Sequence, residues 1–163
     1  MKKVFVILMF GKPFPWIDKF IDSVQHLEKY GWCWKIFTPN KFESKGNVEI
    51  VPMTIDEFNL LVEKKTGITP LTYITDKGIP SSHVTDYMVA YGKIFEDYLK
   101  CDFWGMMGGP DIVFGRLDRF LPDSFLEDCD IFTDDVKAIN GCFTLFRNTE
   151  EINTLFKKIP NWE

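Results

Sequence analysis

The chain has 163 residues, carries a formal net charge of −5 at neutral pH and is rich in aromatic side chains, among them 16 Phe and 5 Trp. This length favours one domain, residues 1–163, with a core rich in aromatic rings. Binding to a phosphate backbone needs clustered Lys and Arg, and no basic run is present. The composition therefore argues against a nucleic-acid partner.

The N-terminus carries two lysines and then an apolar run, Val4 to Phe10, which faintly resembles a secretion signal. The run is only seven residues long and continues into Gly11-Lys12-Pro13 without a small-residue cleavage site, so it predicts a strand instead. No apolar run reaches the length that a transmembrane segment needs. The scattered cysteines are typical of reduced thiols in a cytoplasmic protein; they are Cys33, Cys101, Cys129 and Cys142.

Several common chemistries are disfavoured because their motifs are missing. The sequence has no Walker loop, no GxGxxG, no HExxH and no GxSxG. Its only histidines are His26 and His83, so neither a zinc site nor a Cys–His nucleophile is expected.

Apolar patterning predicts alternating strands and helices. Thr54 and Glu57 have the spacing of a capping box, and Gly31 is placed to end the first helix. Pro, Gly, Thr and Ser make 67–82 irregular. Strands are predicted at 4–10, 32–37, 48–53, 103–107, 131–134 and 142–146. Helices are predicted at 16–29, 54–65, 84–99, 116–120, 122–129 and from 148 to about 159. This order predicts an α/β fold with a mostly parallel, twisted sheet flanked by helices.

The stretch from Asp102 to Gly115 holds the most informative loop. A buried strand is predicted to end at Gly108-Gly109-Pro110, and Asp111 follows directly. An acid just past the carboxyl end of a buried strand is a common position for a metal or sugar ligand. A tight turn that uses Gly, Pro and Asp for their backbone angles is the alternative.

Other polar residues also follow predicted strands. Asn40 comes after the second strand, and Asp134 and Asp135 come after a later one. Lys12 is the cation best placed for an anionic ligand, and Trp16 could stack on a base or a sugar. Because ligands of open α/β sheets bind outside the carboxyl ends of the strands, these residues could converge. Each one alone also fits an ordinary surface or turn residue.

Several blocks give the chain a family resemblance. They are Met9-Phe10-Gly11-Lys12-Pro13-Phe14-Pro15-Trp16, Trp34-Lys35-Ile36-Phe37-Thr38, Asp86-Tyr87-Met88-Val89-Ala90-Tyr91-Gly92 with Ile94 to Leu99, the stretch from Asp102 to Leu121, and Gly141 to Asn148. In this order the sequence resembles uncharacterised microbial and viral glycosyltransferase-like proteins related to the GT-A type nucleotide-sugar transferases. The blocks cover most of residues 4–158.

The resemblance implies a GT-A-like single domain and a donor site. In such enzymes an Asp-x-Asp motif binds the ribose and a divalent cation, which neutralises the diphosphate leaving group. Asp111 matches the second Asp and is expected to contact Mn²⁺ or Mg²⁺, with Lys12 and Asn40 at the nucleotide. The implied partners are a nucleotide-sugar donor and a glycan or other hydroxyl acceptor.

The sequence also departs from the family pattern. Gly108 or Gly109 stands where the first Asp is expected, and Asn40 replaces an Asp. Met88-Val89 stands in place of a Lys-Pro, and Cys142 in place of a His. The chain ends where such transferases usually continue into an acceptor-binding part, which suggests a minimal or truncated transferase domain.

Three functions remain open from the sequence. The first is metal-assisted glycosyl transfer. The second is a non-catalytic sugar-binding, nucleotide-binding or scaffold module. The third is a metal-independent transferase that uses side chains such as Arg116 or Arg147 in place of the cation. A homo-oligomer is compatible with each of them, since the sequence does not separate exposed aromatic side chains from buried ones.

Overall fold

The computed structural model of the chain describes residues 1–78, 80–135 and 137–160. Residue 79 of the predicted irregular segment and the last three residues of the chain lie outside this part. In it, six strands form one sheet in the order β3-β2-β1-β4-β6-β5. The strands are β1 (Lys3–Leu8), β2 (Trp32–Thr38), β3 (Val48–Pro52), β4 (Phe103–Met106), β5 (Ile131–Thr133) and β6 (Thr144–Arg147). β1 to β4 run parallel, and β6 is antiparallel to both of its neighbours, so the predicted α/β class with a mostly parallel sheet is confirmed.

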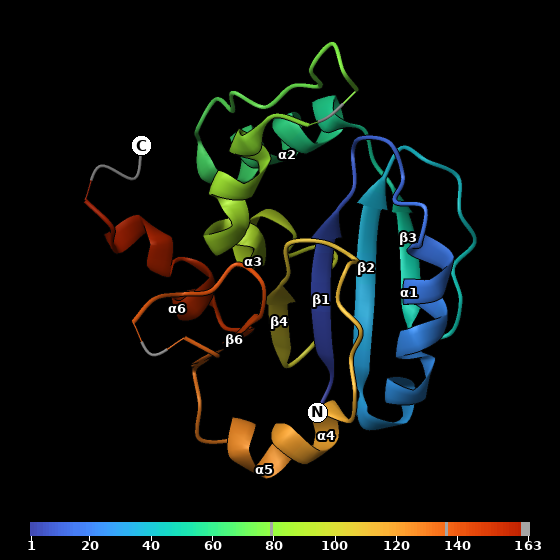
Figure 1. Cartoon of the computed structure of the whole chain (residues 1–163). Coiled ribbons are helices and arrows are strands. Elements are labelled where there is room, and N and C mark those ends of the chain that lie inside the picture. The colour runs from blue at the N-terminus through green and yellow to red at the C-terminus, as the bar shows by residue number, and fades with distance from the viewer. Residues whose placement is uncertain (79, 136, 161–163) are drawn as a thin grey trace.

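Helices cover both faces of the sheet (Figure 1). α1, η1 and the segment after β4 pack on one face, and α2, η2, α3 and α6 pack on the other. No helix in the described ranges is long and apolar enough to cross a membrane. The helices are α1 (Ile17–Val24), α2 (Ile55–Thr66), α3 (Tyr91–Ile94), α4 (Leu117–Phe120), α5 (Asp123–Leu126) and α6 (Glu150–Asn153), with 3-10 segments η1 (Gln25–Tyr30), η2 (Ser82–Ala90) and η3 (Leu155–Lys158).

β1 lies inside the sheet and is buried on both faces. Val4 and Val6 pack toward α2 and α3, while Phe5 and Ile7 pack toward α1. All four are at most 1% exposed. This explains why the strand is a continuous apolar run in the sequence instead of an alternating one.

The helix ends follow the predicted capping signals, but several predicted helices differ. The predicted helix 16–29 is α1 followed by the 3-10 segment η1, and the last predicted helix is α6 followed by η3. Thr54 and Glu57 form the capping box that starts α2, and Gly31, with φ of 77°, ends η1. The predicted helix 84–99 is instead the 3-10 segment η2 followed by the short α3. β-branched residues such as Thr85 and Val89, together with Gly92, lower helix propensity in this segment.

Phe5 holds together the face of the sheet that carries α1. Its ring lies 5.1–6.1 Å, centroid to centroid, from four other aromatic side chains. Gly105 of β4 leaves the room for it, because a Cβ at that position would lie 2.5 Å from a Phe5 ring carbon. The four partners are Trp32 and Trp34 of β2, Phe114 of the segment after β4, and Phe143 before β6.

Ion pairs link the helices on the opposite face. The Glu96 carboxylate accepts hydrogen bonds from Lys65 Nζ of α2 and from Lys93 Nζ of α3, each at 2.8 Å. Lys93 also reaches Glu150 of α6 at 3.2 Å. The hydrogen bonds from Lys65 and Lys93 lower the pKa of Glu96.

This lowered pKa predicts an acid-sensitive contribution to stability. The ionised Glu96 stabilises the fold above the ordinary carboxyl pKa of 4.5, and the contribution is lost as the pH falls through the lower folded-state pKa. We expect Glu96→Gln to lower the free energy of unfolding by on the order of 1 kcal/mol near neutral pH and to match the wild type at about pH 3. Urea unfolding at both pH values measures this, with the exposed Glu151→Gln as control. A pH-independent difference would contradict the ion-pair role.

Candidate functional site

The order of the strands reverses next to β1. From β1 the chain continues to β2 and β3 on one side, and it later returns to β4 on the other side of β1. The carboxyl ends of β1 and β4 therefore flank a point where the strand order reverses. In open α/β sheets, ligands bind in the crevice outside such a point. The segments that leave this edge begin after Leu8 of β1, after Thr38 of β2 and after Met106 of β4.

Asn40 ties the first two of these segments together. Its Nδ2 donates to the Gly11 carbonyl at 3.0 Å and to Thr38 Oγ1 at 3.1 Å. Its backbone N–H donates to the same hydroxyl at 3.1 Å. Thr38 is fully buried, so the contact is anchored in the core. Asn40 thus lies beside the backbone that carries Lys12.

Asp111 lies where the segment after β4 meets the segment after β1. A Cβ placed on Gly109 would lie 3.6 Å from Asp111 Oδ1 and 4.0 Å from the ring of Phe14. The Phe14 ring in turn stacks on Trp16, with centroids 5.3 Å apart. Trp16 is 44% exposed, so part of its aromatic surface is open to solvent.

The charged side chains at this edge are free to meet a ligand. Lys12 and Asp111 are exposed. Neither side chain makes a hydrogen bond or an ion pair among residues 1–78, 80–135 and 137–160. The structure thus places the three residues that the sequence singled out on loops that leave one edge of the sheet. Asn40 contacts the carbonyl of Gly11, the residue before Lys12, and Asp111 and Phe14 both lie near Gly109.

The segment between β5 and β6 reaches the same edge. Gly141 O lies 4.0 Å from the Cβ position of Gly108. The acids that precede it act within their own turn: Asp134 Oδ1 accepts from Asn140 Nδ2, and Asp135 Oδ1 accepts from the Lys137 N–H, both at 2.8 Å. They stabilise the turn and do not join Asp111 in a cluster. The described residues contain no group of three or more His, Cys, Asp or Glu side chains arranged to hold a metal ion.

The two arginines considered for a metal-independent reaction lie at the opposite edge of the sheet. Arg116 forms a bidentate pair with Asp118 and lies 5.0 Å from the ring of Tyr30, just before β2 starts. Arg147 ends β6, pairs with Asp130 at 3.0 Å and donates to three backbone carbonyls. Both arginines are therefore held at the amino ends of the parallel strands, at the opposite edge from the loops that carry Lys12, Asn40 and Asp111.

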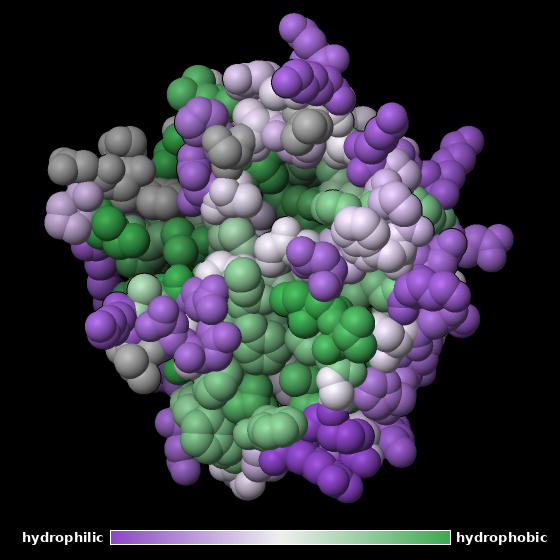
Figure 2. Space-filling model, viewed as in Figure 1, coloured by the Kyte–Doolittle hydropathy of each residue, from purple (hydrophilic) through white to green (hydrophobic). Residues whose placement is uncertain are grey.

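An apolar groove that the sequence did not reveal lies on the α1 face of the sheet. It has a volume of about 520 Å³ and opens in the apolar area at the lower centre of Figure 2. Phe120 and Phe125, from α4 and α5, are 81% and 48% exposed there. Composition predicted many aromatic side chains, but only packing distinguishes these exposed rings from the core. The other aromatic residues that line it are Phe114, Phe132 and Phe143.

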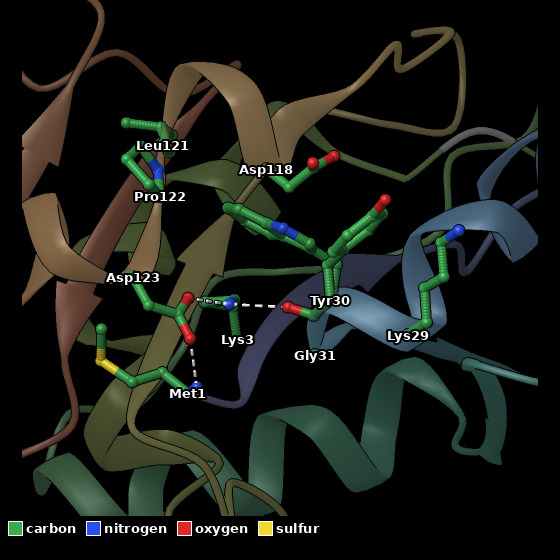
Figure 3. Close-up of a pocket in the computed structure, with 10 residues that line it drawn as sticks. Met1, Lys3, Lys29, Tyr30, Gly31, Asp118, Leu121, Pro122 and Asp123 are labelled. Atoms are coloured by element: carbon green, nitrogen blue, oxygen red, sulfur yellow. Dashed lines mark hydrogen bonds and ion pairs between the residues drawn. The ribbon is translucent and has the colours of Figure 1, made fainter.

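A second cavity, of about 460 Å³, lies at the amino edge and is a structural feature (Figure 3). Lys3 is 1% exposed there, and its Nζ donates to Tyr30 O at 2.8 Å and to Asp123 Oδ1 at 2.6 Å. Asp123 also pairs with the α-amino group of Met1. Burial raises the pKa of the Asp123 carboxyl, but the hydrogen bonds from Lys3 and the α-amino group outweigh it and lower that pKa overall. The ammonium groups of Lys3 and Met1 are thus paired with the Asp123 carboxylate.

The fold and this edge define an α/β protein with a mostly parallel sheet, helices on both faces and a loop cluster at the point where the strand order reverses. Residues 5–162 match the profile of a family described as "Family of unknown function (DUF6625)". The match spans nearly the whole chain, so the protein belongs to this family. No curated protein and no solved structure matches it.

The position of Asn40 predicts that an acid does not substitute for it. Asn40→Asp removes the donor to the Gly11 carbonyl and places a carboxylate against that oxygen, while Asn40→Ala only removes the donor. We expect Ala to cost about 1 kcal/mol in the free energy of unfolding and Asp about 1–3 kcal/mol, measured by urea denaturation. The exposed neighbour Lys41→Ala serves as control. An Asp variant as stable as the wild type would show that the amide donor is dispensable.

Proposed function

We propose that the protein binds a nucleotide-sugar donor at the carboxyl edge of β1, β2 and β4 and transfers the sugar to a glycan or other hydroxyl acceptor, as a GT-A-like transferase. The observation that supports this proposal is that Lys12, Asn40 and Asp111 lie on loops that follow β1, β2 and β4, next to the point where the strand order reverses. The sequence resemblance to GT-A type transferases supports it independently.

Each part of such a donor has a chemical match at this edge. Lys12 offers an ammonium group that pairs with no other described residue and can bind the diphosphate. The Phe14–Trp16 pair offers a ring face for a base or a sugar. Asp111 offers a carboxylate that accepts from sugar or ribose hydroxyl groups. Asn40 Nδ2 is already used by Gly11 and Thr38, so its contribution to the donor site is to hold the Lys12 segment in place.

The residues present do not form a divalent-cation site by themselves. Hard cations such as Mg²⁺ take six or more oxygen ligands, and the described residues contain no group of three or more His, Cys, Asp or Glu side chains that could hold a metal ion around Asp111. A bound Mn²⁺ or Mg²⁺ would therefore be held mainly by the substrate diphosphate, with Asp111 as a single protein ligand. We assign no chemical step to the ion.

One observation favours a second candidate function, a nucleotide-binding or sugar-binding module that does not catalyse transfer. The carboxylate of Asp111 has no second acid beside it, since Gly108 and Gly109 precede it. A lone, exposed carboxylate is enough to recognise hydroxyl groups, whereas metal-assisted departure of a diphosphate depends on a tightly held ion. The two functions share one site and differ in turnover.

Calorimetric titration with UDP- and GDP-sugars, with and without Mn²⁺, tests the site. We expect Lys12→Ala and Asp111→Ala each to weaken binding by about tenfold or more, which corresponds to roughly 1.4 kcal/mol. Lys100→Ala and Asp128→Ala are matched controls, because both residues are exposed and lie at the amino edge of the sheet. Both controls are expected to bind as the wild type does.

The outcomes separate the candidates. Binding that requires Mn²⁺ and is lost in Asp111→Ala supports a metal-assisted transferase, and sugar release from the donor in the presence of an acceptor would establish turnover. Binding without release of the sugar supports the non-catalytic module. Absence of binding to every nucleotide-sugar, or equal loss in the control variants, would exclude a donor site at this edge.

A further inference from the structure

The groove on the α1 face is preformed, since its floor is part of the aromatic core. Phe143 lies 5.1 Å from Phe5 and 5.9 Å from Phe114, centroid to centroid. Phe132 meets Phe143 edge-on at 6.2 Å, and Phe125 meets Phe132 edge-on at 6.1 Å. This chain of rings connects α5 to the centre of the sheet. The groove is therefore open before a ligand binds.

The lining of the groove is polar at one end and apolar at the other. Its polar lining residues, Asp134 and Cys142, flank the β5–β6 segment at the carboxyl edge. Ile112, which also lines it, directly follows Asp111. At the other end Phe125 belongs to α5, near the amino edge. The groove thus runs from the proposed donor site, where it is polar, to an apolar end.

The size of the groove and the charge of its lining indicate which class of ligand it fits. Ten described residues line the groove, whereas a stable protein interface uses roughly 20–30 residues on each side. Its volume of about 520 Å³ lies within the range of roughly 300–1,000 Å³ that is usual for small-molecule pockets. Asp134 is the one charged residue among the ten. An anionic head group would be repelled there, while a neutral, hydroxyl-bearing head group can donate to that carboxylate.

We propose that this groove binds the hydrocarbon tail of an amphipathic acceptor whose neutral, hydroxyl-bearing head lies at the carboxyl edge, next to Asp111. The proposal deepens the proposed function and rests on it for the role of the head group. Binding of the tail depends on the groove alone, because apolar surface is removed from water whether or not a donor is present.

Binding of n-octyl β-glucoside below its micelle-forming concentration tests the groove, followed by calorimetry and by NMR of the Ile112 and Leu117 methyl groups. Methyl β-glucoside carries the same head without the tail, and octanoate carries a tail of the same kind with an anionic head. We expect octyl glucoside to bind and to shift both methyl groups, octanoate to bind at least several-fold more weakly, and methyl glucoside to leave them unchanged.

Phe120→Asp is the variant that separates the groove from the fold. Phe120 is 81% exposed, so the substitution places a charge in the groove without disturbing the core. We expect it to weaken octyl glucoside binding about tenfold or more. Leu71→Asp, at a residue that is 70% exposed and does not line the groove, is the matched control and is expected to bind as the wild type does.

Three results would overturn the proposal. The first is equal binding of octyl glucoside by the wild type and Phe120→Asp, and the second is binding of octanoate as tight as that of octyl glucoside. The third is a dimer in sedimentation velocity that Phe120→Asp dissociates, because a second copy of the chain would then occupy the groove. The nucleotide-sugar titrations separate the two proposals. Octyl glucoside binding without donor binding removes the acceptor role and the proposed function together. Donor binding without octyl glucoside binding removes only the groove proposal.

Discussion

The packing of Phe5 is the contact on which both the fold and the candidate site depend. This ring joins β1 to β2 through two tryptophans and holds the segment after β4 through Phe114, the same segment that carries Asp111. Through Phe143 it also supports the floor of the groove. Truncating a buried Phe typically costs about 3–5 kcal/mol, and here the loss would extend to the position of the loop after β4. A change in the packing of Phe5 would therefore also change the geometry of the candidate site.

Three cations at the amino edge of the sheet are paired with acids: Lys3 with Asp123, Arg116 with Asp118, and Arg147 with Asp130. Other charged side chains at that edge, such as Lys100, make no ion pair among the described residues. At the carboxyl edge, Lys12 and Asp111 have no such partners among the described residues. An exposed, unmatched charge on a short, anchored loop is available for a ligand at little cost in reorganisation.

Much of the fold was predictable because its signals are local. The apolar run of β1, the Thr54–Glu57 capping box and Gly31 each specify structure within a few residues, and they predicted the element order. The predicted loop residues Lys12, Asn40 and Asp111 also fell on one edge, since parallel strands bring their carboxyl ends together. The structural use of Asn40 was not predictable, because its partner Gly11 is 29 residues away and is contacted through a backbone carbonyl. The groove was missed for a similar reason: Phe114 and Phe120 are alike in sequence, and only tertiary packing buries one and exposes the other.

Gly109 gives the loop a latent capacity that its present residues do not use. Its backbone is not among those with positive φ, and a Cβ there would make only ordinary contacts with Asp111 and Phe14. Nothing in the backbone therefore demands glycine, and an aspartate at this position would place a second carboxylate two residues before the first. Two such acids repel each other until a cation screens them, which is the electrostatic basis of a divalent-ion site. A single substitution thus separates this loop from a paired-acid one, and the backbone around Gly109 has room for it.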